Sequence, residues 1–277
     1  MRLATLNVPG RGEVAAEISS DGARYRVLGS PGDALADHLG TGARRAAGSG
    51  WTGEVSDCRF APVIPRPGAI WCVGLNYEDH RMEIGRARAA YPTLFTRFPV
   101  CLVGAEEPLV RPKASAQLDY EGELAVVIGK RGRHISEAGA LDHVAGYACF
   151  NDASVRDFQN HSSQFGPGKN FHRTGGFGPW LVTADEIPEP QDLEIRTRLN
   201  GEVMQESHTS RMSWGVRELI AYLSRITPLL PGDVIATGTP SGVGVARDPQ
   251  VFLRPGDSVE VEIGGVGILR NPVTQES

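Results

Sequence analysis

The chain has 277 residues, of which 40% are hydrophobic and 22% are charged, and its formal net charge at pH 7 is −5. This length suits one catalytic domain with a small additional unit, and it allows a core that needs no disulfide or metal for folding. The acidic balance argues against a general nucleic-acid-binding or anionic-membrane-binding protein.

No apolar segment of the sequence approaches the ~20 residues of a membrane-spanning helix, and the first residues contain no hydrophobic signal core. We therefore expect a cytoplasmic protein without a membrane partner. The four cysteines include no Cys-x-x-Cys pair, which disfavours zinc-ribbon and thioredoxin chemistry. Three of them lie in apolar runs, as is typical of reduced, buried thiols.

The 34 glycines and 19 prolines are spread along the chain as punctuation. This pattern predicts many short strands and turns, and thus a mainly β fold with some α (α+β). Residues 1–65 are predicted to form a small N-terminal unit, with strands over 3–8 and 13–18 and a short helix over 33–39 capped by Asp33. Prolines then interrupt the pattern, and residues 66–277 are predicted to form the catalytic domain.

Within the second unit, apolar runs predict buried strands over residues 69–75, 124–128 and 144–150. Residues 76–91 combine helix formers with many charges, which suggests a mobile lid. The clearest helix is predicted over 216–226, where Val216, Leu219, Ile220 and Leu223 share one face. Pro-Gly-Asp occurs twice, at 231–233 and 255–257, and each copy precedes a predicted strand. Two similar turns explain this better than an internal repeat.

Glu121 and Glu123 are two residues apart at the start of an apolar strand, so their side chains point to the same face. Neighbouring carboxylates repel each other and are costly to bury unpaired, and a cation between them removes both problems. We nominate Asp152, which follows the strand over 144–150, as a third oxygen donor. Such a set favours a hard ion such as Mg²⁺ or Mn²⁺. The spacing alone equally allows an exposed strand edge whose charges deter aggregation.

His80 and Glu83 are three residues apart, so they meet on one side of a helical turn. A carboxylate that holds one imidazole nitrogen leaves the other as an oriented general base. A surface ion pair on a charged helix is the simpler explanation of an isolated His-x-x-Glu. The position of His80 after a buried strand and a turn favours the catalytic interpretation, because active sites tend to lie there.

Further polar residues lie in the segment 151–170. Arg156 and Gln159 are spaced to face a pocket from one short helix, and Lys169 lies in a Gly/Pro loop where it can stabilise developing negative charge. For each of them taken alone, a solvated surface position is the simpler explanation. The glycine-rich segment 236–244 contains Thr239 and exposes backbone N–H groups suited to a carboxylate or phosphate. A plain turn between strands explains that segment equally well.

These motifs together resemble the fumarylacetoacetate hydrolase family. The matching stretches include VGLNYEDHRMEIG, LDYEGELAVVIGK, AGYACFNDASVRDFQ, GPGKNF, LIAYLSRITPLLPGDVIATGTPSGVG and LRPGDSVEVEIGGVGIL, in the family's order. They span about residues 73–269, and several of them are long and specific. The first 60 residues match no strong motif.

The resemblance implies a rolled β-sandwich, usually a homodimer, with a small-molecule 2-oxo acid as substrate. It implies a divalent cation at Glu121, Glu123 and Asp152, with Mg²⁺ favoured over Mn²⁺ or Ca²⁺. It also implies a His80–Glu83 dyad on a lid that orders over substrate. Lys169, Gln159 and Arg156 would match charge-stabilising and substrate-binding groups. Thr239 and Tyr77 would match further substrate-binding positions.

The reaction expected from the resemblance is hydrolysis of a C–C bond in a 2,4-dioxo acid, which gives a pyruvate-type product and a carboxylic acid. His80 would activate water, and Lys169 with Gln159 would stabilise the oxyanion. The same site suits two alternatives, decarboxylation of an oxaloacetate-like acid and hydration or isomerisation of a 2-hydroxydienoate. A non-catalytic binding protein is a further alternative, but it has no need for the dyad. Leu75 replaces an arginine of some acylpyruvate-cleaving members, and the segment Phe95–Pro99 departs from the family's Phe-Leu-Lys-Pro pattern.

Overall fold

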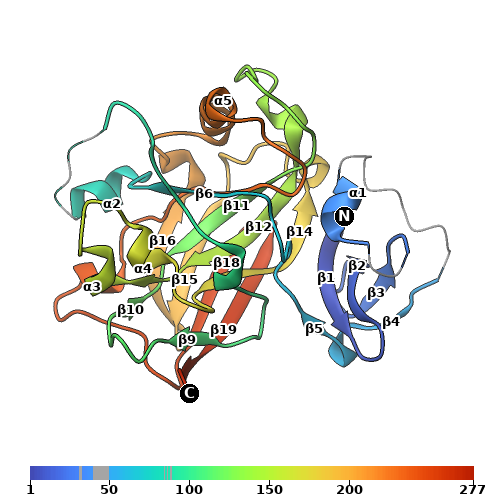
Figure 1. Cartoon of the computed structure of the whole chain (residues 1–277), viewed down its shortest axis with the longest axis horizontal. Coiled ribbons are helices and arrows are strands. Elements are labelled where there is room, and N and C mark those ends of the chain that lie inside the picture. The colour runs from blue at the N-terminus through green and yellow to red at the C-terminus, as the bar shows by residue number, and fades with distance from the viewer. Residues whose placement is uncertain (31–32, 40–49, 84, 86, 88) are drawn as a thin grey trace.

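The computed structural model describes residues 1–30, 33–39, 50–83, 85, 87 and 89–277. Over these residues the protein is mainly β, with a few short helices (Figure 1). The helices are α1 (Leu35–Leu39), α2 (Glu78–Glu83), α3 (Arg156–Gln159), α4 (Gly166–Lys169) and α5 (Val216–Ile226). Short 3₁₀ turns lie at Val55–Asp57, Pro99–Cys101, Ala140–His143, Ala184–Glu186, Thr209–Arg211 and Gly244–Ala246. None of the described helices is long and apolar enough to cross a membrane.

The larger sheet follows the order β4-β3-β2-β1-β14-β12-β11-β17-β6-β7, with β5 paired to β1 and β8 to β14. Its strands are β1 (Arg2–Val8), β2 (Gly12–Ile18), β3 (Arg24–Val27), β4 (Gly53–Glu54), β5 (Arg59–Phe60), β6 (Ile70–Gly74), β7 (Thr93–Thr96), β8 (Leu102–Val103), β11 (Gly122–Ile128), β12 (Val144–Asp152), β14 (Gly175–Thr183) and β17 (Val234–Ala236). The expected strands near 3–8, 13–18, 69–75, 124–128 and 144–150 are thus all present.

A second sheet has the order β16-β15-β18-β19-β9, and β10 pairs with β13. These strands are β9 (Leu109–Arg111), β10 (Leu118–Asp119), β13 (Ser154–Val155), β15 (Glu194–Leu199), β16 (Glu202–His208), β18 (Ser258–Ile263) and β19 (Gly267–Gln275). The apolar run of β11 is buried on both faces. Leu124 and Val126 pack in a core with β15, β18 and α5, while Ala125 and Val127 pack in another core with β6 and β12.

The N-terminal strands lie to one side of the molecule (Figure 1). β1 pairs with β14 only through Arg2 and Leu3, opposite Val182 and Leu181. The helix predicted over 33–39 begins at Leu35, so the assignment of Asp33 as its cap is wrong. The Asp33 carboxylate instead accepts a hydrogen bond from the backbone N–H of Ser30. The division at residue 65 stays a prediction.

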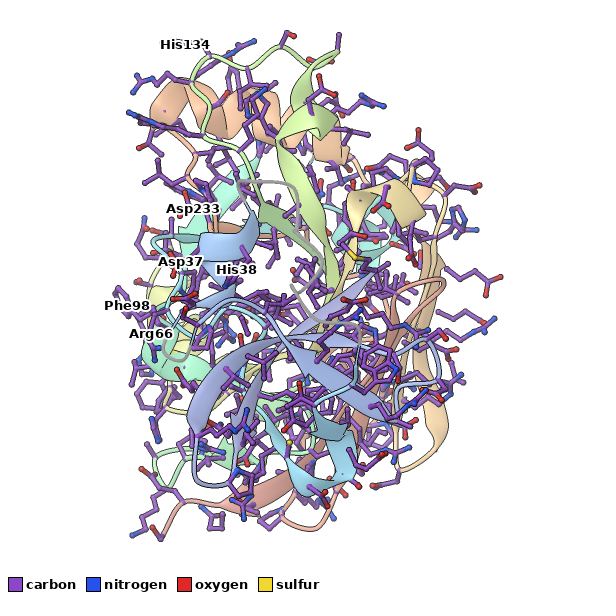
Figure 2. The ribbon with its side chains drawn as sticks, turned by 90° about the vertical axis from the view of Figure 1, so that its right-hand side faces the viewer. Asp37, His38, Arg66, Phe98, His134 and Asp233 are labelled. Carbon is purple, nitrogen blue, oxygen red and sulfur yellow. The ribbon has the colours of Figure 1, made fainter. Side chains whose placement is uncertain are left out.

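The two Pro-Gly-Asp segments form the same local turn. Asp233 accepts from the N–H of Leu230 at 2.8 Å, and Asp257 accepts from the N–H of Arg254 at 2.7 Å. The strands that follow, β17 and β18, belong to different sheets, which agrees with turns rather than a repeat. Figure 2 shows Asp233 next to α1, which carries Asp37 and His38. Gly232 has a φ of +87°, and a Cβ there would lie 2.8 Å from the Cβ of Ala36, so this contact needs glycine.

Helix α5 has the predicted bounds, and all four residues of its predicted apolar face are buried. Leu219 is 1% exposed and belongs to the core beneath the helix. We expect Leu219→Ala to lower the free energy of unfolding by about 2–5 kcal/mol, because it removes buried methyl groups and leaves a cavity. Denaturant titration measures this, with Arg225→Ala at an exposed position of the same helix as the control. Equal unfolding midpoints for the two variants would contradict the packing role of α5.

Candidate active site

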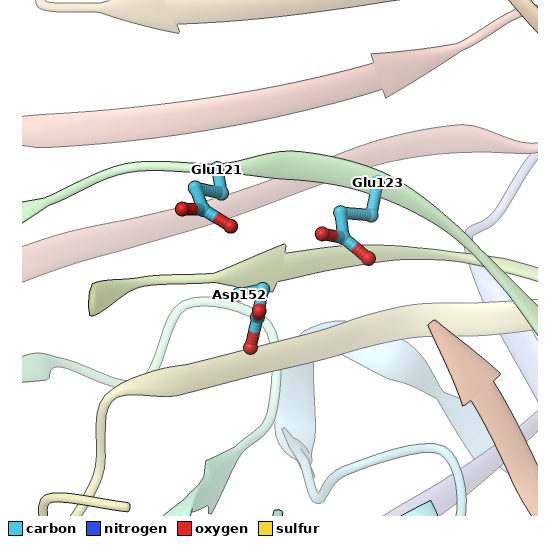
Figure 3. A group of neighbouring side chains, drawn as sticks. All are labelled: Glu121, Glu123 and Asp152. Carbon is cyan, nitrogen blue, oxygen red and sulfur yellow. The ribbon is translucent and has the colours of Figure 1, made fainter. Parts of the chain in front are cut away.

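The predicted metal ligands come together through the pairing of β11 with β12. Gly122 lies opposite Asn151, so Glu121 and Asp152 are directly opposed, and the N–H of Asp152 donates to the carbonyl of Glu121 at 2.8 Å. Figure 3 shows Glu123, on β11, and Glu121, just before this strand, both pointing toward Asp152. All three side chains are buried, and one carboxylate oxygen from each lies within 4.8 Å of the others. The alternative of an exposed strand edge is therefore wrong.

Two buried cations bind these carboxylates from α3 and α4. Lys169 donates to Glu121 at 2.7 Å and to Asp152 at 2.6 Å, and Arg156 donates to Glu121 at 2.6 Å and to Asp119 at 2.8 Å. Neither cation is a solvated surface group, because Lys169 is 2% and Arg156 is 5% exposed. Burial alone would raise the pKa of Glu121, but Lys169 and Arg156 outweigh it and lower this pKa to about 2.

Arg97 is a third buried cation of the site, and sequence reasoning did not select it. Its guanidinium binds the carboxylate of Asp152, the carbonyl of Ala153 and the hydroxyl of Thr174. The signal that could have found it was the departure from the family's pattern over Phe95–Pro99, which places arginine beside the site. Asp119 was also missed, although it lies two residues before Glu121.

Glu123 differs from the other two carboxylates. Among the described residues, its carboxylate accepts a hydrogen bond from the N–H of Gly238, at 2.8 Å. In the part of the chain that the structure describes, no lysine or arginine pairs with it. Burial, together with the negative charges of Asp152 and Glu121, raises the pKa of Glu123 well above its ordinary value. A buried carboxylate of this kind is stabilised by a nearby cation.

The donor set fits a divalent cation in both charge and geometry. Within the described residues, four carboxylates and three cationic groups meet here, which leaves one negative charge uncompensated. The members are Asp119, Glu121, Glu123, Asp152, Arg97, Arg156 and Lys169. Two oxygens bound to one Mg²⁺ can be at most about 4.2 Å apart, and for Ca²⁺ about 4.8 Å, as twice the metal–oxygen distance. The three carboxylate oxygens lie within 4.8 Å of one another, which matches the Ca²⁺ limit, whereas Mg²⁺ requires them to be closer together.

The His80–Glu83 pair forms on α2, as the spacing predicted. His80 Nδ1 lies 3.1 Å from the Glu83 carboxylate, which leaves Nε2 as the remaining nitrogen of the ring. His80 is 6% exposed. Residues 84, 86 and 88 of the predicted lid lie outside the described residues, so the lid stays a prediction. The pair meets the geometric condition for an oriented base.

A cavity of about 420 Å³ connects the dyad with Glu121 and Glu123. Its polar wall is formed by His80, Glu83, Glu121, Glu123, Arg156, Gln159, Asn160, Lys169 and Thr239, and its apolar wall by Val73, Leu75, Phe95, Phe165, Val245 and Ala246. Leu75 adopts a φ of +59°, a strained conformation for leucine. Such a site accommodates a ligand with one charged end and one less polar side.

Of the remaining predicted residues, Gln159 and Thr239 line the cavity and Tyr77 does not. Gln159 lines the cavity and accepts from Arg156 Nη1 at 2.9 Å. Thr239 also lines it, but its hydroxyl already donates to the carbonyl of Gly122 and accepts from Gln205. Tyr77 is fully buried and is not among the lining residues, and its hydroxyl has no hydrogen-bond partner within the described ranges. Gln205 was missed because nothing local in the sequence of β16 marks it.

The four cysteines are free, as expected, and three of them are buried. Burial raises the pKa of the Cys72 and Cys149 thiols. These thiols are thus poor nucleophiles.

Comparison with known proteins places this site in a family. The profile described as Fumarylacetoacetate (FAA) hydrolase C-terminal matches residues 69–274. The mitochondrial oxaloacetate tautomerase FAHD2A of Bos taurus is 43% identical over 220 residues, which cover 79% of this chain and 70% of that protein.

Two solved structures resemble the whole chain. The fumarylacetoacetate hydrolase of psychrophilic Exiguobacterium antarcticum is 35% identical, with a TM-score of 0.88 and 100% coverage of both chains. The 2-hydroxyhepta-2,4-diene-1,7-dioate isomerase of Mycobacterium marinum is 34% identical, with a TM-score of 0.82 and coverage of 100% of this chain and 99% of that one. Together with the profile match, these similarities show that the chain belongs to the fumarylacetoacetate hydrolase family.

Proposed function

We propose that this protein is a divalent-cation-dependent isomerase that interconverts the keto and enol forms of a 2-oxo dicarboxylic acid of the oxaloacetate type. The observation that carries the proposal is the His80–Glu83 pair, which shares one cavity with Glu121 and Glu123 of the buried carboxylate cluster. The tautomerase and isomerase names of similar proteins support this reaction class over the C–C hydrolysis expected first.

Tautomerisation moves one proton between C3 and the 2-oxo oxygen and needs no co-reactant. A divalent cation at Glu121, Glu123 and Asp152 would supply polarisation of the 2-oxo group. In the enol-forming direction His80 would take the C3 proton on Nε2 and deliver it to the 2-oxo oxygen, which regenerates the neutral imidazole, and the reverse reaction would run the same transfer backwards, while Glu83 holds Nδ1.

Arg156 supports binding of a ligand with carboxylate groups. Its Nη1 and Nε are engaged by Glu121, Gln159 and Asp119. Its Nη2 is buried and has no hydrogen-bond partner among the residues described. A buried donor without a partner is costly, so an acceptor oxygen of the ligand would satisfy it. This extends the prediction that Arg156 binds substrate.

An assay on oxaloacetate tests the proposal. The enol form absorbs in the ultraviolet, so with Mg²⁺ or Mn²⁺ the purified protein should speed the loss of enol absorbance beyond the uncatalysed rate. A chelator should abolish the effect, and added cation should restore it. Product analysis should find oxaloacetate, without release of pyruvate or carbon dioxide in step with the absorbance. An uncatalysed rate at every protein concentration would reject this function.

Hydrolysis of an acylpyruvate remains the second candidate. It is favoured by the position of His80 at a cavity large enough for water and substrate together, and by the hydrolase name of a similar structure. Release of pyruvate and a carboxylic acid from an acylpyruvate, abolished by chelator, would replace the proposed isomerase with this reaction. Carbon dioxide from oxaloacetate would instead indicate the decarboxylase alternative.

A further inference from the structure

The segment from Thr237 to Ala246 lies between the carboxylate cluster and α2. On the cluster side, the Gly238 N–H donates to Glu123 at 2.8 Å, and the Thr239 hydroxyl donates to the carbonyl of Gly122 at 2.9 Å. The Gly244 N–H also donates to Asp119 at 2.8 Å. The segment is thus tied to β10 and β11, next to two of the three predicted metal ligands.

The same segment contacts α2 on its other side. The Ser241 hydroxyl donates to Asp79 at 3.2 Å, and the Gly242 N–H donates to Glu83 at 2.9 Å. The second oxygen of Asp79 accepts from the backbone N–H of His80 at 2.8 Å. Asp79 and Glu83, the two carboxylates that contact His80, are therefore held by the adjacent residues Ser241 and Gly242.

Gly242 is itself firmly placed. Its carbonyl accepts from the Tyr120 hydroxyl at 3.0 Å and from Arg247 Nε at 3.2 Å. Its φ is +97°, and a Cβ there would lie 2.2 Å from the carbonyl oxygen of Met204. The direction of its N–H toward Glu83 is thus fixed by the backbone, and glycine is required at this position.

Helix α2 has six residues, too few to be stable without tertiary contacts. We propose that Ser241 and Gly242 form a latch that holds α2 against the segment 237–246, and that Asp79 is a positioning residue that keeps His80 and Glu83 aimed into the cavity. The latch depends on the proposed function only because that function assigns proton transfer to His80. The contacts themselves are independent of the reaction.

Two measurements on Ser241 variants test the latch. Hydrogen–deuterium exchange should show faster exchange of the α2 amides in Ser241→Ala, by about tenfold, as expected for loss of one hydrogen bond to a carboxylate. Ser241→Thr keeps a hydroxyl and should restore slow exchange. In the same Ser241→Ala protein, kcat should fall about tenfold, while KM and the cation-dependent thermal shift change less than about twofold.

Asp79→Asn provides a second arm, with Glu78→Gln as its matched control. Both remove one negative charge from the first turn of α2, but only Asp79 accepts from Ser241. Faster exchange and lower kcat in Asp79→Asn, but not in Glu78→Gln, would support the positioning role.

The outcomes separate the latch from the proposed function. Unchanged α2 exchange in Ser241→Ala overturns the latch, whatever happens to activity. Faster exchange with unchanged kcat overturns the positioning role of Asp79 and Ser241. If the unmodified protein turns over no 2-oxo acid while Ser241→Ala still loosens α2, the latch stands and the proposed function fails.

Discussion

Replacing Glu123 by glutamine is expected to give a folded protein that no longer gains stability from Mg²⁺ or Mn²⁺. Glu123 is the carboxylate of the cluster that lacks a cationic partner among the described residues, and burial together with neighbouring negative charges raises its pKa. An uncharged amide of the same shape removes this unfavourable buried charge. It also removes one of the three predicted metal ligands.

The effect should have opposite signs with and without cation. Without cation, Glu123→Gln should be as stable as the unmodified protein or more so. With cation at about 100 times its dissociation constant, the unmodified protein should gain about 2.7 kcal/mol, which corresponds to roughly 5–10 °C in Tm. Glu123→Gln should gain almost nothing, and its turnover should fall by about a hundredfold or more.

Thermal unfolding with and without Mg²⁺ or Mn²⁺ measures this change in the sign of the stability difference. Glu137→Gln, at an exposed position, provides a control with the same chemical change. Asp152→Asn is a poorer probe, because Asp152 also pairs with Arg97 and Lys169, and the loss of a buried ion pair is itself destabilising. An equal cation-induced shift in Glu123→Gln and the unmodified protein would argue against the predicted metal site.

Local periodicity explains why parts of this structure could be predicted from the sequence. Helix α5 has a clear 3.6-residue apolar stripe, and its bounds match the prediction. The shared face of Glu121 and Glu123 follows from the two-residue repeat of a strand. Their burial did not follow, because it depends on how β11 is packed between β12 and β17 and covered on both faces.

The rest of the site depends on strand register, which a single sequence does not specify. Glu121 meets Asp152 because Gly122 is opposite Asn151, and a shift of one residue would send Asp152 to the other face. β17 and β6 run parallel, with Ala236 beside Cys72, so the segments that follow them emerge at the same edge. This pairing brings Ser241 to Asp79, 162 residues away in the chain. Neither residue is marked by its local sequence.

The buried cations were the least predictable part. Arg156 and Lys169 were nominated for the cavity, but their pairing with Glu121 was not anticipated. Lys169 was expected to stabilise an oxyanion, whereas here it bridges two predicted metal ligands. Charge is not periodic in sequence, so which cation compensates which carboxylate is decided only when the strands and turns assemble.

Replacing His80 by alanine is expected to lower kcat by about a hundredfold to ten-thousandfold, because it removes the proposed proton-transfer group. Metal binding should survive, since the predicted site consists of three carboxylates and does not include His80. The cation-dependent rise in Tm should therefore equal that of the unmodified protein. Steady-state kinetics and thermal unfolding of the same sample measure the two effects. His172→Ala, which alters an exposed histidine, is the control for loss of an imidazole.

Glu83→Gln separates orientation from proton transfer. The amide can still contact His80 Nδ1 and accept from the Gly242 N–H, but it carries no charge to stabilise a protonated imidazole. We expect a smaller loss of kcat than in His80→Ala, and no added loss when both changes are combined, because residues that act as one unit are non-additive. Losses that multiply in the double variant would show that the two residues act separately. A parallel loss of the cation-dependent Tm rise in His80→Ala would move His80 from proton transfer to support of the metal site.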